Sequence, residues 1–320
     1  MGAGFASGRE LISFFGDGLG FWVVPVVALF VFGTSYLFLM VGNKLNTVSI
    51  NSNTALFGRF APVAEFFALL NSFILLAVML AGTTVISGTM HGVPVVAIIA
   101  GIIAVAILKY GINGLMRANL VLIPLLILVL ILVCTLSVKY FVWQSNFDIL
   151  ILPKSILYVS LNMYLASGAL HQLKLSTKQA IIASTIASII IGTLLLALML
   201  AIKSNPSSML EPMPLLYIAS KLGGAYKILV SCTLILCIFS SMLIAIHNVV
   251  EWLQTIINDR IIAGLIALTC AFIISMLGFQ QLVQYLYPII SVVGMVYIGG
   301  NVVYLFRNAK CTIHNDDKAF

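Results

Sequence analysis

The chain has 320 residues, of which 62% are hydrophobic and only 8% are charged, and its formal net charge is +7. Soluble domains carry about 25% charged residues, so this composition excludes a soluble protein and indicates an integral membrane protein built from α-helices. The positive charge needs no nucleic-acid partner, because Lys and Arg gather in the cytoplasmic loops of membrane proteins.

Apolar segments recur along the whole chain, separated by turns rich in Gly, Asn, Pro and charge. A membrane-spanning helix needs about 20 apolar residues, and the first segment is too short to span alone. The ten expected segments are 5–16, 20–42, 61–88, 93–109, 118–138, 153–172, 179–202, 227–250, 261–278 and 284–306. The remaining residues, 307–320, form a tail.

The distribution of Lys and Arg sets the expected orientation in the cell membrane. With the N-terminus in the cytoplasm, ten basic residues fall in inside connections and five in outside connections, which fits the positive-inside rule. We therefore expect a multi-pass protein whose two termini are both cytoplasmic.

Similar spacing in the two halves of the chain predicts an internal repeat. The tripeptide Ala-Ser-Gly occurs at 6–8 and again at 166–168, and segments 3, 4 and 5 start 166, 168 and 166 residues before segments 8, 9 and 10. Two five-helix units, 1–139 and 150–306, account for this register. Because five is odd, the second unit enters the membrane from the opposite side, which gives the inverted repeat typical of secondary transporters.

Small and polar residues in segments 1 and 6 predict that both helices are broken. Unwinding inside a membrane is costly unless the freed amides and carbonyls meet a ligand; amides at a helix start suit a carboxylate and free carbonyls suit a small cation. The expected solute-binding residues are Gly2, Ala3, Gly4, Ser7, Gly8, Ser160, Asn162, Ser167 and Gly168. The alternative is close helix packing through small residues.

The opening stretch GAGFASGRELISFF closely resembles the first-helix signature of the YkvI-like membrane proteins, with Arg9 in place of the usual Gln. That family is similar to the amino acid–polyamine–organocation transporters, so the resemblance implies the LeuT fold with broken helices 1 and 6. In those proteins an apolar half-helix precedes the Gly-x-Gly. The resemblance therefore implies that the first half of helix 1 is missing here, through a late start codon or a truncation.

The resemblance also suggests an ion site on segment 8. Ser240 and Ser241 resemble the hydroxyl pair that holds sodium in sodium-coupled LeuT-fold carriers, and Met1 falls where the first-helix carbonyl ligands lie. A serine bonded to its own preceding turn is the alternative. No Lys or Arg lies between Arg117 and Lys139, where some proton-coupled relatives use a lysine, so sodium is favoured as the coupling ion and protons are the second choice.

Acidic residues in membrane segments are candidates for gating or coupling. Glu10 directly follows the expected break, whereas Glu65 and Glu251 lie near helix ends, where a solvated gate or a packing pair is the favoured interpretation. His171 and His247 are candidate proton relays, although each is more often a satisfied interior histidine.

The favoured function is a secondary active transporter that imports an amino acid or a similar small amine-bearing solute together with sodium, by alternating access. The alternative is a permease-like receptor that senses a solute without net transport. Enzyme function is not expected, because the chain contains no His-Glu-x-x-His motif and too few intramembrane carboxylates for paired acid–base work. No cofactor is expected apart from the coupling ion, and the sequence does not name the solute.

Overall fold

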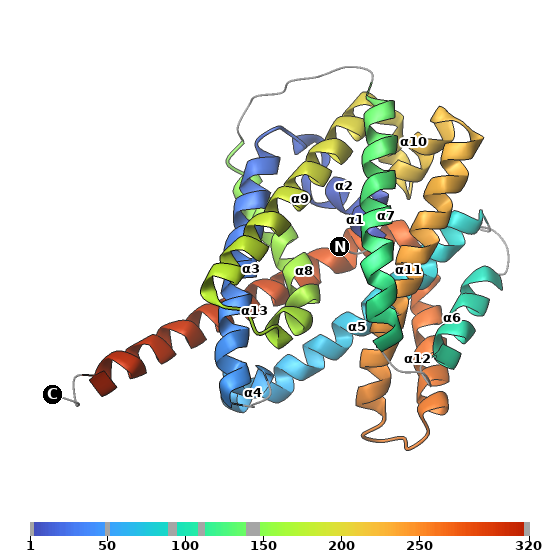
Figure 1. The fold of residues 1–320 in the computed structure, drawn as a ribbon. Coiled ribbons are helices and arrows are strands. Elements are labelled where there is room, and N and C mark those ends of the chain that lie inside the picture. The colour runs from blue at the N-terminus through green and yellow to red at the C-terminus, as the bar shows by residue number, and fades with distance from the viewer. Residues whose placement is uncertain (1–2, 49–51, 89–94, 108–112, 139–147, 317–320) are drawn as a thin grey trace. The chain divides into compact units, whose positions relative to one another are not determined.

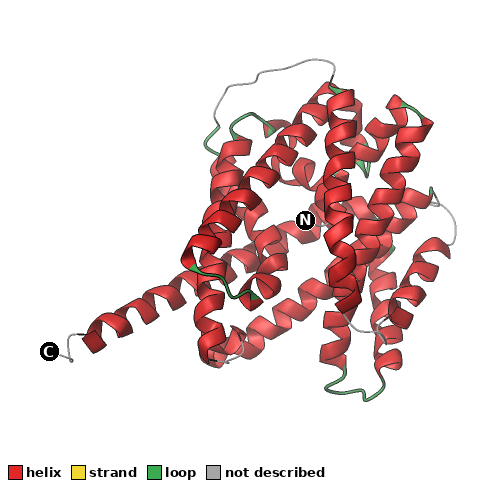
Figure 2. Cartoon of the chain, viewed as in Figure 1, coloured by secondary structure: helices red, strands yellow, loops and turns green. Residues whose placement is uncertain are grey.

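The computed structural model describes residues 3–48, 52–88, 95–107, 113–138 and 148–316, and every regular element in this part of the chain is a helix (Figure 2). The elements are α1 (Ala3–Ser7), α2 (Arg9–Phe15), η1 (Gly16–Gly18), α3 (Val23–Val48), α4 (Ser52–Phe57), η2 (Gly58–Phe60), α5 (Ala61–Ser87), α6 (Val95–Ile107), α7 (Asn113–Ser137), α8 (Ile151–Gln172), α9 (Thr177–Ser204), η4 (Pro206–Leu210), α10 (Pro214–Leu222), α11 (Gly224–Leu253), α12 (Arg260–Ser275) and α13 (Phe279–Asp316).

The helices match the expected segments closely. The first segment corresponds to α1 and α2 together, and the other nine correspond in order to α3, α5, α6, α7, α8, α9, α11, α12 and α13. The short elements α4, η4 and α10 lie in stretches that the sequence left as connections. Apolar length is a local property of the sequence, so it locates the long helices well.

Five helical stretches in the described residues are long and apolar enough to cross a membrane: Val23–Leu45, Ser52–Ser87, Thr177–Ser204, Gly224–Leu253 and Phe279–Arg307. Three shorter apolar helices are Val95–Ala106, Leu122–Ser137 and Arg260–Ser275. Helix α8 is not among them, since Lys154, Asn162 and His171 interrupt its apolar run. Five of the ten expected segments are therefore confirmed, by length and composition, as able to cross a membrane.

The chain divides into two compact units, and α5, α9 and α13 each run from one unit into the other. The first unit contains Met1–Phe21, Ala68–Ser145 and Leu194–Tyr287. The second contains Trp22–Phe67, Asn146–Thr193 and Pro288–Phe320. Each unit takes residues from both halves of the chain, and the inverted repeat itself stays a prediction.

Helix α11 is the centre of the first unit. It packs against α6, α7, α10 and α12, and also against the short α1 at the start of the chain (Figure 1). Helix α5 also approaches α11 closely, since a Cβ atom at Gly82 of α5 would lie 3.0 Å from the side chain of Ile238. The broken first segment is therefore held by the longest helix of its own unit.

In the second unit, α3 packs along α8 (Figure 1). Asn43, near the end of α3, holds the connection that follows α8, because its side chain both donates to the carbonyl oxygen of Leu175 and accepts from the Leu175 amide at 2.9 Å. The backbones also approach closely here: a Cβ atom at Gly42 would lie 2.7 Å from the carbonyl oxygen of His171.

The predicted break in segment 6 is wrong, because α8 is helical throughout Ile151–Gln172. The polar side chains bond to their own helix: Asn162 Nδ2 donates to the carbonyl of Tyr158 at 3.1 Å, and Ser167 Oγ donates to that of Tyr164 at 2.7 Å. The backbone of Ser160 instead packs closely against α13, since a Cβ atom at Gly294 would lie 2.4 Å from the carbonyl oxygen of Ser160. The packing alternative explains these residues.

Candidate functional site

The first segment does break, at Gly8. Gly8 has φ 80° and ψ −6°, a left-handed conformation that separates α1 from α2 and favours glycine. Ser7 is fully buried; its Oγ donates to the carbonyl of Gly4 at 2.8 Å and accepts from the amide of Arg9 at 3.2 Å. The break is narrower than expected, because Ala3–Ser7 is helical rather than unwound.

Arg9, the first residue of α2, is 5% exposed. Its Nη1 donates to two backbone carbonyl oxygens, those of Met209 at 3.0 Å and Glu211 at 3.3 Å. These carbonyls lie at the end of η4, where unsatisfied carbonyls and the helix dipole favour a cation. Arg9 therefore fastens the break to the connection between α9 and α10, within the first unit.

Glu10 is also buried, with 2% of its surface exposed. Its carboxylate lies over Gly4, because a Cβ atom at Gly4 would be 2.1 Å from Glu10 Oε1. The fully buried Tyr287 lies within electrostatic range of this carboxylate. The absence of a side chain at Gly4 thus leaves room for the carboxylate of Glu10.

The predicted sodium ligands lie on α11, with Ser240 buried and Ser241 half-buried. Helix α11 packs against α1, so the serines and the break belong to elements that touch within one unit. Met1 and Gly2 lie outside the described residues. No group of three or more His, Cys, Asp or Glu side chains suited to a metal ion occurs in the described chain, and the hydroxyl-based sodium site stays a prediction.

The other two acidic candidates are exposed. Glu251 accepts a hydrogen bond from Arg260 Nη2 at 2.8 Å, and the same Nη2 lies 3.2 Å from His247 Nδ1. This cluster joins the end of α11 to the start of α12, which favours the packing-pair interpretation for Glu251. Glu65 is exposed on the first turns of α5.

A buried polar pair joins α8 to α13 in the second unit. His171 Nε2 lies 2.9 Å from Asn301 Oδ1, and Asn301 Nδ2 donates to the carbonyl of Tyr297 at 2.8 Å. The imidazole also contacts the rings of Phe38 and Tyr297, with centroids 5.3 and 6.1 Å away. His171 is therefore an interior histidine whose Nε2 is held by Asn301.

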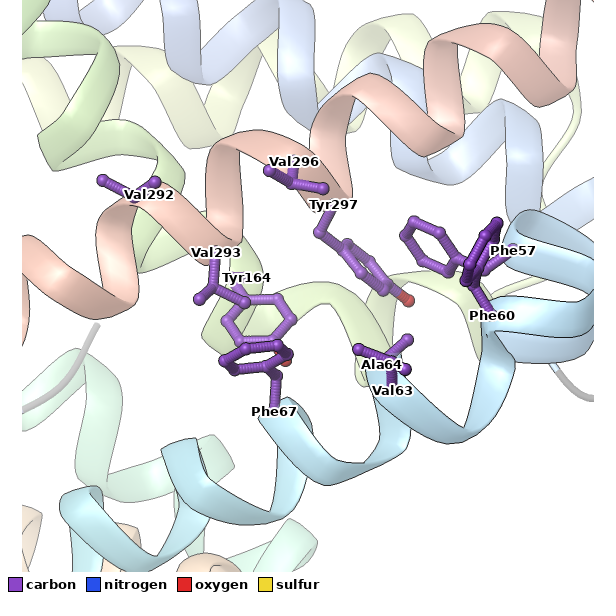
Figure 3. Close-up of a pocket in the computed structure, with 10 residues that line it drawn as sticks. All are labelled: Phe57, Phe60, Val63, Ala64, Phe67, Tyr164, Val292, Val293, Val296 and Tyr297. Carbon is purple, nitrogen blue, oxygen red and sulfur yellow. The ribbon is translucent and has the colours of Figure 1, made fainter.

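Beside this pair lies an aromatic pocket of about 490 Å³ (Figure 3). One wall comes from the stretch that ends α4 and begins α5: Phe57, Phe60, Val63, Ala64 and Phe67. The opposite wall comes from α13 and α8: Val292, Val293, Val296, Tyr297 and Tyr164. All of these residues belong to the second unit.

The residues predicted to bind the solute fall in both units. Gly4, Ser7 and Gly8 belong to the first unit, whereas Ser160, Asn162, Ser167 and Gly168 belong to the second. Segments 1 and 6 lie in different units, and their convergence on one solute stays a prediction. Sequence reasoning missed the partners of Arg9 and the pocket, because backbone carbonyls have no sequence signature and aromatic residues are ordinary in apolar segments.

Comparisons with known proteins support the membrane assignment. The chain is 25% identical over 330 residues to the uncharacterized membrane protein YkvI of Bacillus subtilis (strain 168), with 93% of this chain and 91% of YkvI covered. It is also 25% identical over 324 residues to the uncharacterized protein YyaD of the same organism, with 92% and 90% covered. No family model matches the chain.

The expected resemblance to YkvI thus extends over most of the chain, at low identity. Together with the five long apolar helices, it identifies the chain as a helical membrane protein.

Proposed function

We propose that this protein is a secondary active transporter that moves an amino acid or a similar small amine-bearing solute across the cell membrane, without chemical change to the solute. The observation that carries the proposal is the buried helix break at Gly8, flanked by the buried side chains of Ser7, Arg9 and Glu10. Interrupted helices with polar groups inside a membrane protein are typical of the solute sites of secondary transporters.

The cost of this arrangement supports a functional role. Ionisable side chains inside membrane helices are expensive and mark solute or ion pathways by default. Arg9 and Glu10 are both almost fully buried next to a glycine that adopts φ 80°. Apolar residues in a continuous helix would serve a purely structural role at a lower free-energy cost.

Sodium coupling is part of the proposal. The packing of α1 on α11 brings the broken segment against the helix that carries Ser240 and Ser241, and hydroxyl and carbonyl oxygens are the hard ligands that small cations prefer. The wider proposal includes a LeuT-like arrangement of helices in which segment 6 is continuous, membership of the amino acid–polyamine–organocation superfamily and cytoplasmic termini. The resemblance of the opening stretch and the positive-inside count support these three points.

Reconstitution into liposomes tests the function. Purified protein is placed in vesicles, and uptake of a set of radiolabelled amino acids is measured with an inward sodium gradient, with potassium replacing sodium, and after an ionophore has collapsed the gradient. Sodium-dependent accumulation of one class of amino acid is expected. Saturable binding of a solute without accumulation under any gradient would contradict transport and indicate the sensing receptor.

A further inference from the structure

We propose that the aromatic pocket of the second unit binds one acyl chain of an anionic phospholipid, whose headgroup is held by Arg59. This binding site does not depend on the transported solute, and it involves no residue of the Gly8 break. The proposal rests on the shape of the pocket, on its surroundings in a membrane protein and on the charges at one end of the unit.

The pocket has the chemistry of a hydrocarbon chain. Phe57 and Phe60 lie at one end of the hollow, Tyr164 and Phe67 lie at the other, and valine side chains of α13 face α5 across it (Figure 3). A volume of about 490 Å³ is that of a ligand site rather than of a packing defect. Its walls carry no charged side chain, so a solute with a carboxylate or an ammonium group does not match it.

The surroundings of the pocket favour a lipid acyl chain as its ligand. Phe60, Val63 and Val296 line the pocket and are also 58%, 53% and 61% exposed. They belong to stretches that are apolar and long enough to cross a membrane, Ser52–Ser87 and Phe279–Arg307. A pocket whose rim is exposed apolar surface in such helices is open to the acyl chains of the bilayer.

Arg59 supplies the matching charge for a headgroup. It is exposed in η2, between Phe57 and Phe60, and its guanidinium lies 5.1 Å from the centre of the Phe60 ring. Arg59 makes no salt bridge within the part of the chain that the structure describes. A guanidinium stacked on an aromatic ring that lines the pocket is well placed to bind a phosphate when the chain of the same lipid is inside.

Further basic residues gather at the same end of the second unit. The end of α3, the α8–α9 connection, the η2 region and α13 near residue 300 meet there, because Asn43 bonds to Leu175, His171 lies against Asn301 and Phe57 contacts Gly300. The basic side chains of these stretches are Lys44, Arg59, Lys174, Lys178 and Arg307, against the single acid Glu65. Such clusters at a membrane interface attract anionic lipid.

Photolabelling tests the proposal on the whole protein in phosphatidylcholine vesicles. The probes are phosphatidylglycerol and phosphatidylcholine that carry the same diazirine group on one acyl chain, and labelled peptides are located by mass spectrometry. We expect the phosphatidylglycerol probe to label residues 57–67 and 292–297 preferentially, and unlabelled phosphatidylglycerol to compete better than unlabelled phosphatidylcholine. Equal labelling by both probes, or labelling spread evenly over the apolar helices, would overturn the proposal.

Two substitutions test the binding of the acyl chain and the binding of the headgroup separately. Ala64→Trp fills the pocket and should abolish labelling at both peptides, whereas Ile186→Trp, on an exposed part of α9 outside the pocket, should leave it unchanged. Arg59→Gln should lower phosphatidylglycerol labelling about fivefold, the equivalent of about 1 kcal/mol for one basic residue at a membrane surface. Lys221→Gln is its matched control, because Lys221 is also an exposed cation over an aromatic ring, 5.3 Å from the centre of Tyr217, but belongs to the first unit.

The Arg59 variant keeps the test decisive if Ala64→Trp fails to fold. Arg59 is exposed, so its replacement leaves the core intact, and labelling by the phosphatidylcholine probe should not change. Loss of labelling with both probes, or with neither, would show that Arg59 does not select an anionic headgroup. Labelling that a soluble fatty-acid anion competes away as well as phosphatidylglycerol does would contradict a phospholipid as the occupant.

Discussion

Arg9 and Met209 are joined by a hydrogen bond of 3.0 Å between Nη1 and the backbone carbonyl oxygen, although 200 residues separate them in the chain. A second bond of 3.3 Å from the same nitrogen reaches the carbonyl of Glu211. The start of α2 is thereby fastened to the stretch between α9 and α10. Because Arg9 directly follows the helix break, this contact fixes how the break sits within the first unit.

Replacement of Arg9 should loosen that stretch. Arg9→Gln removes the charge and shortens the side chain, so two partly buried carbonyls lose a charged donor, each such bond being worth about 1.5–3 kcal/mol. Burial of the guanidinium costs desolvation free energy, and the removal of that cost offsets part of the lost stability. We expect a net destabilisation of about 1–2 kcal/mol and faster amide exchange in η4 and at the start of α10. Hydrogen exchange measured by mass spectrometry checks this.

Lys221→Gln is the matched control, since Lys221 is an exposed cation near the end of α10 and bonds to no carbonyl of η4. Unchanged exchange in residues 206–213 of the Arg9 variant would show that the two hydrogen bonds do not hold this connection.

The two glycines of the repeated Ala-Ser-Gly should respond to alanine in opposite directions. Gly8 has φ 80°, and a Cβ there would lie 3.3 Å from Ile202 Cδ1, so Gly8→Ala should cost about 1–2 kcal/mol. Gly168 lies inside α8 and has no atom within 4 Å of such a Cβ, so Gly168→Ala should stabilise by about 0.5–1 kcal/mol. Thermal unfolding of both variants in the same detergent compares them directly.

A destabilisation by Gly168→Ala as large as that by Gly8→Ala would contradict a continuous α8 and indicate a break in segment 6.

This contrast shows what the sequence can and cannot decide. Apolar length located the long helices, and the glycines of the opening stretch located the first break. The same reasoning failed in segment 6, because serine and asparagine satisfy their own helix as readily as they leave it. Whether Ser160 unwinds or packs depends on Gly294, which lies 134 positions later in the chain and approaches its carbonyl oxygen. Such a long-range contact is not visible in a single sequence.

The buried pair His171 and Asn301 should be energetically coupled. Their side chains meet at 2.9 Å, and both residues are almost fully buried. His171→Phe and Asn301→Leu should each destabilise the protein by about 1–3 kcal/mol, because each leaves a buried polar partner behind. The double variant should cost less than the sum of the two by about 1 kcal/mol. A double-mutant cycle of unfolding free energies measures this coupling, and strict additivity would show that the hydrogen bond contributes nothing.

The last prediction concerns the proposed coupling ion. If Ser240 and Ser241 supply hydroxyl ligands, the loss of one should weaken sodium binding by about 1 kcal/mol, which raises the sodium concentration for half-maximal uptake by up to about tenfold. Ser240→Ala, Ser241→Ala and the double variant are compared in proteoliposomes at equal protein abundance. Ser231→Ala is the matched control, because Ser231 is a half-buried serine on the same helix, more than two turns away. The maximal rate should change less than the sodium dependence, since the solute is bound elsewhere. An unchanged sodium dependence in the double variant would remove both serines from the ion site and leave sodium coupling without protein ligands on α11.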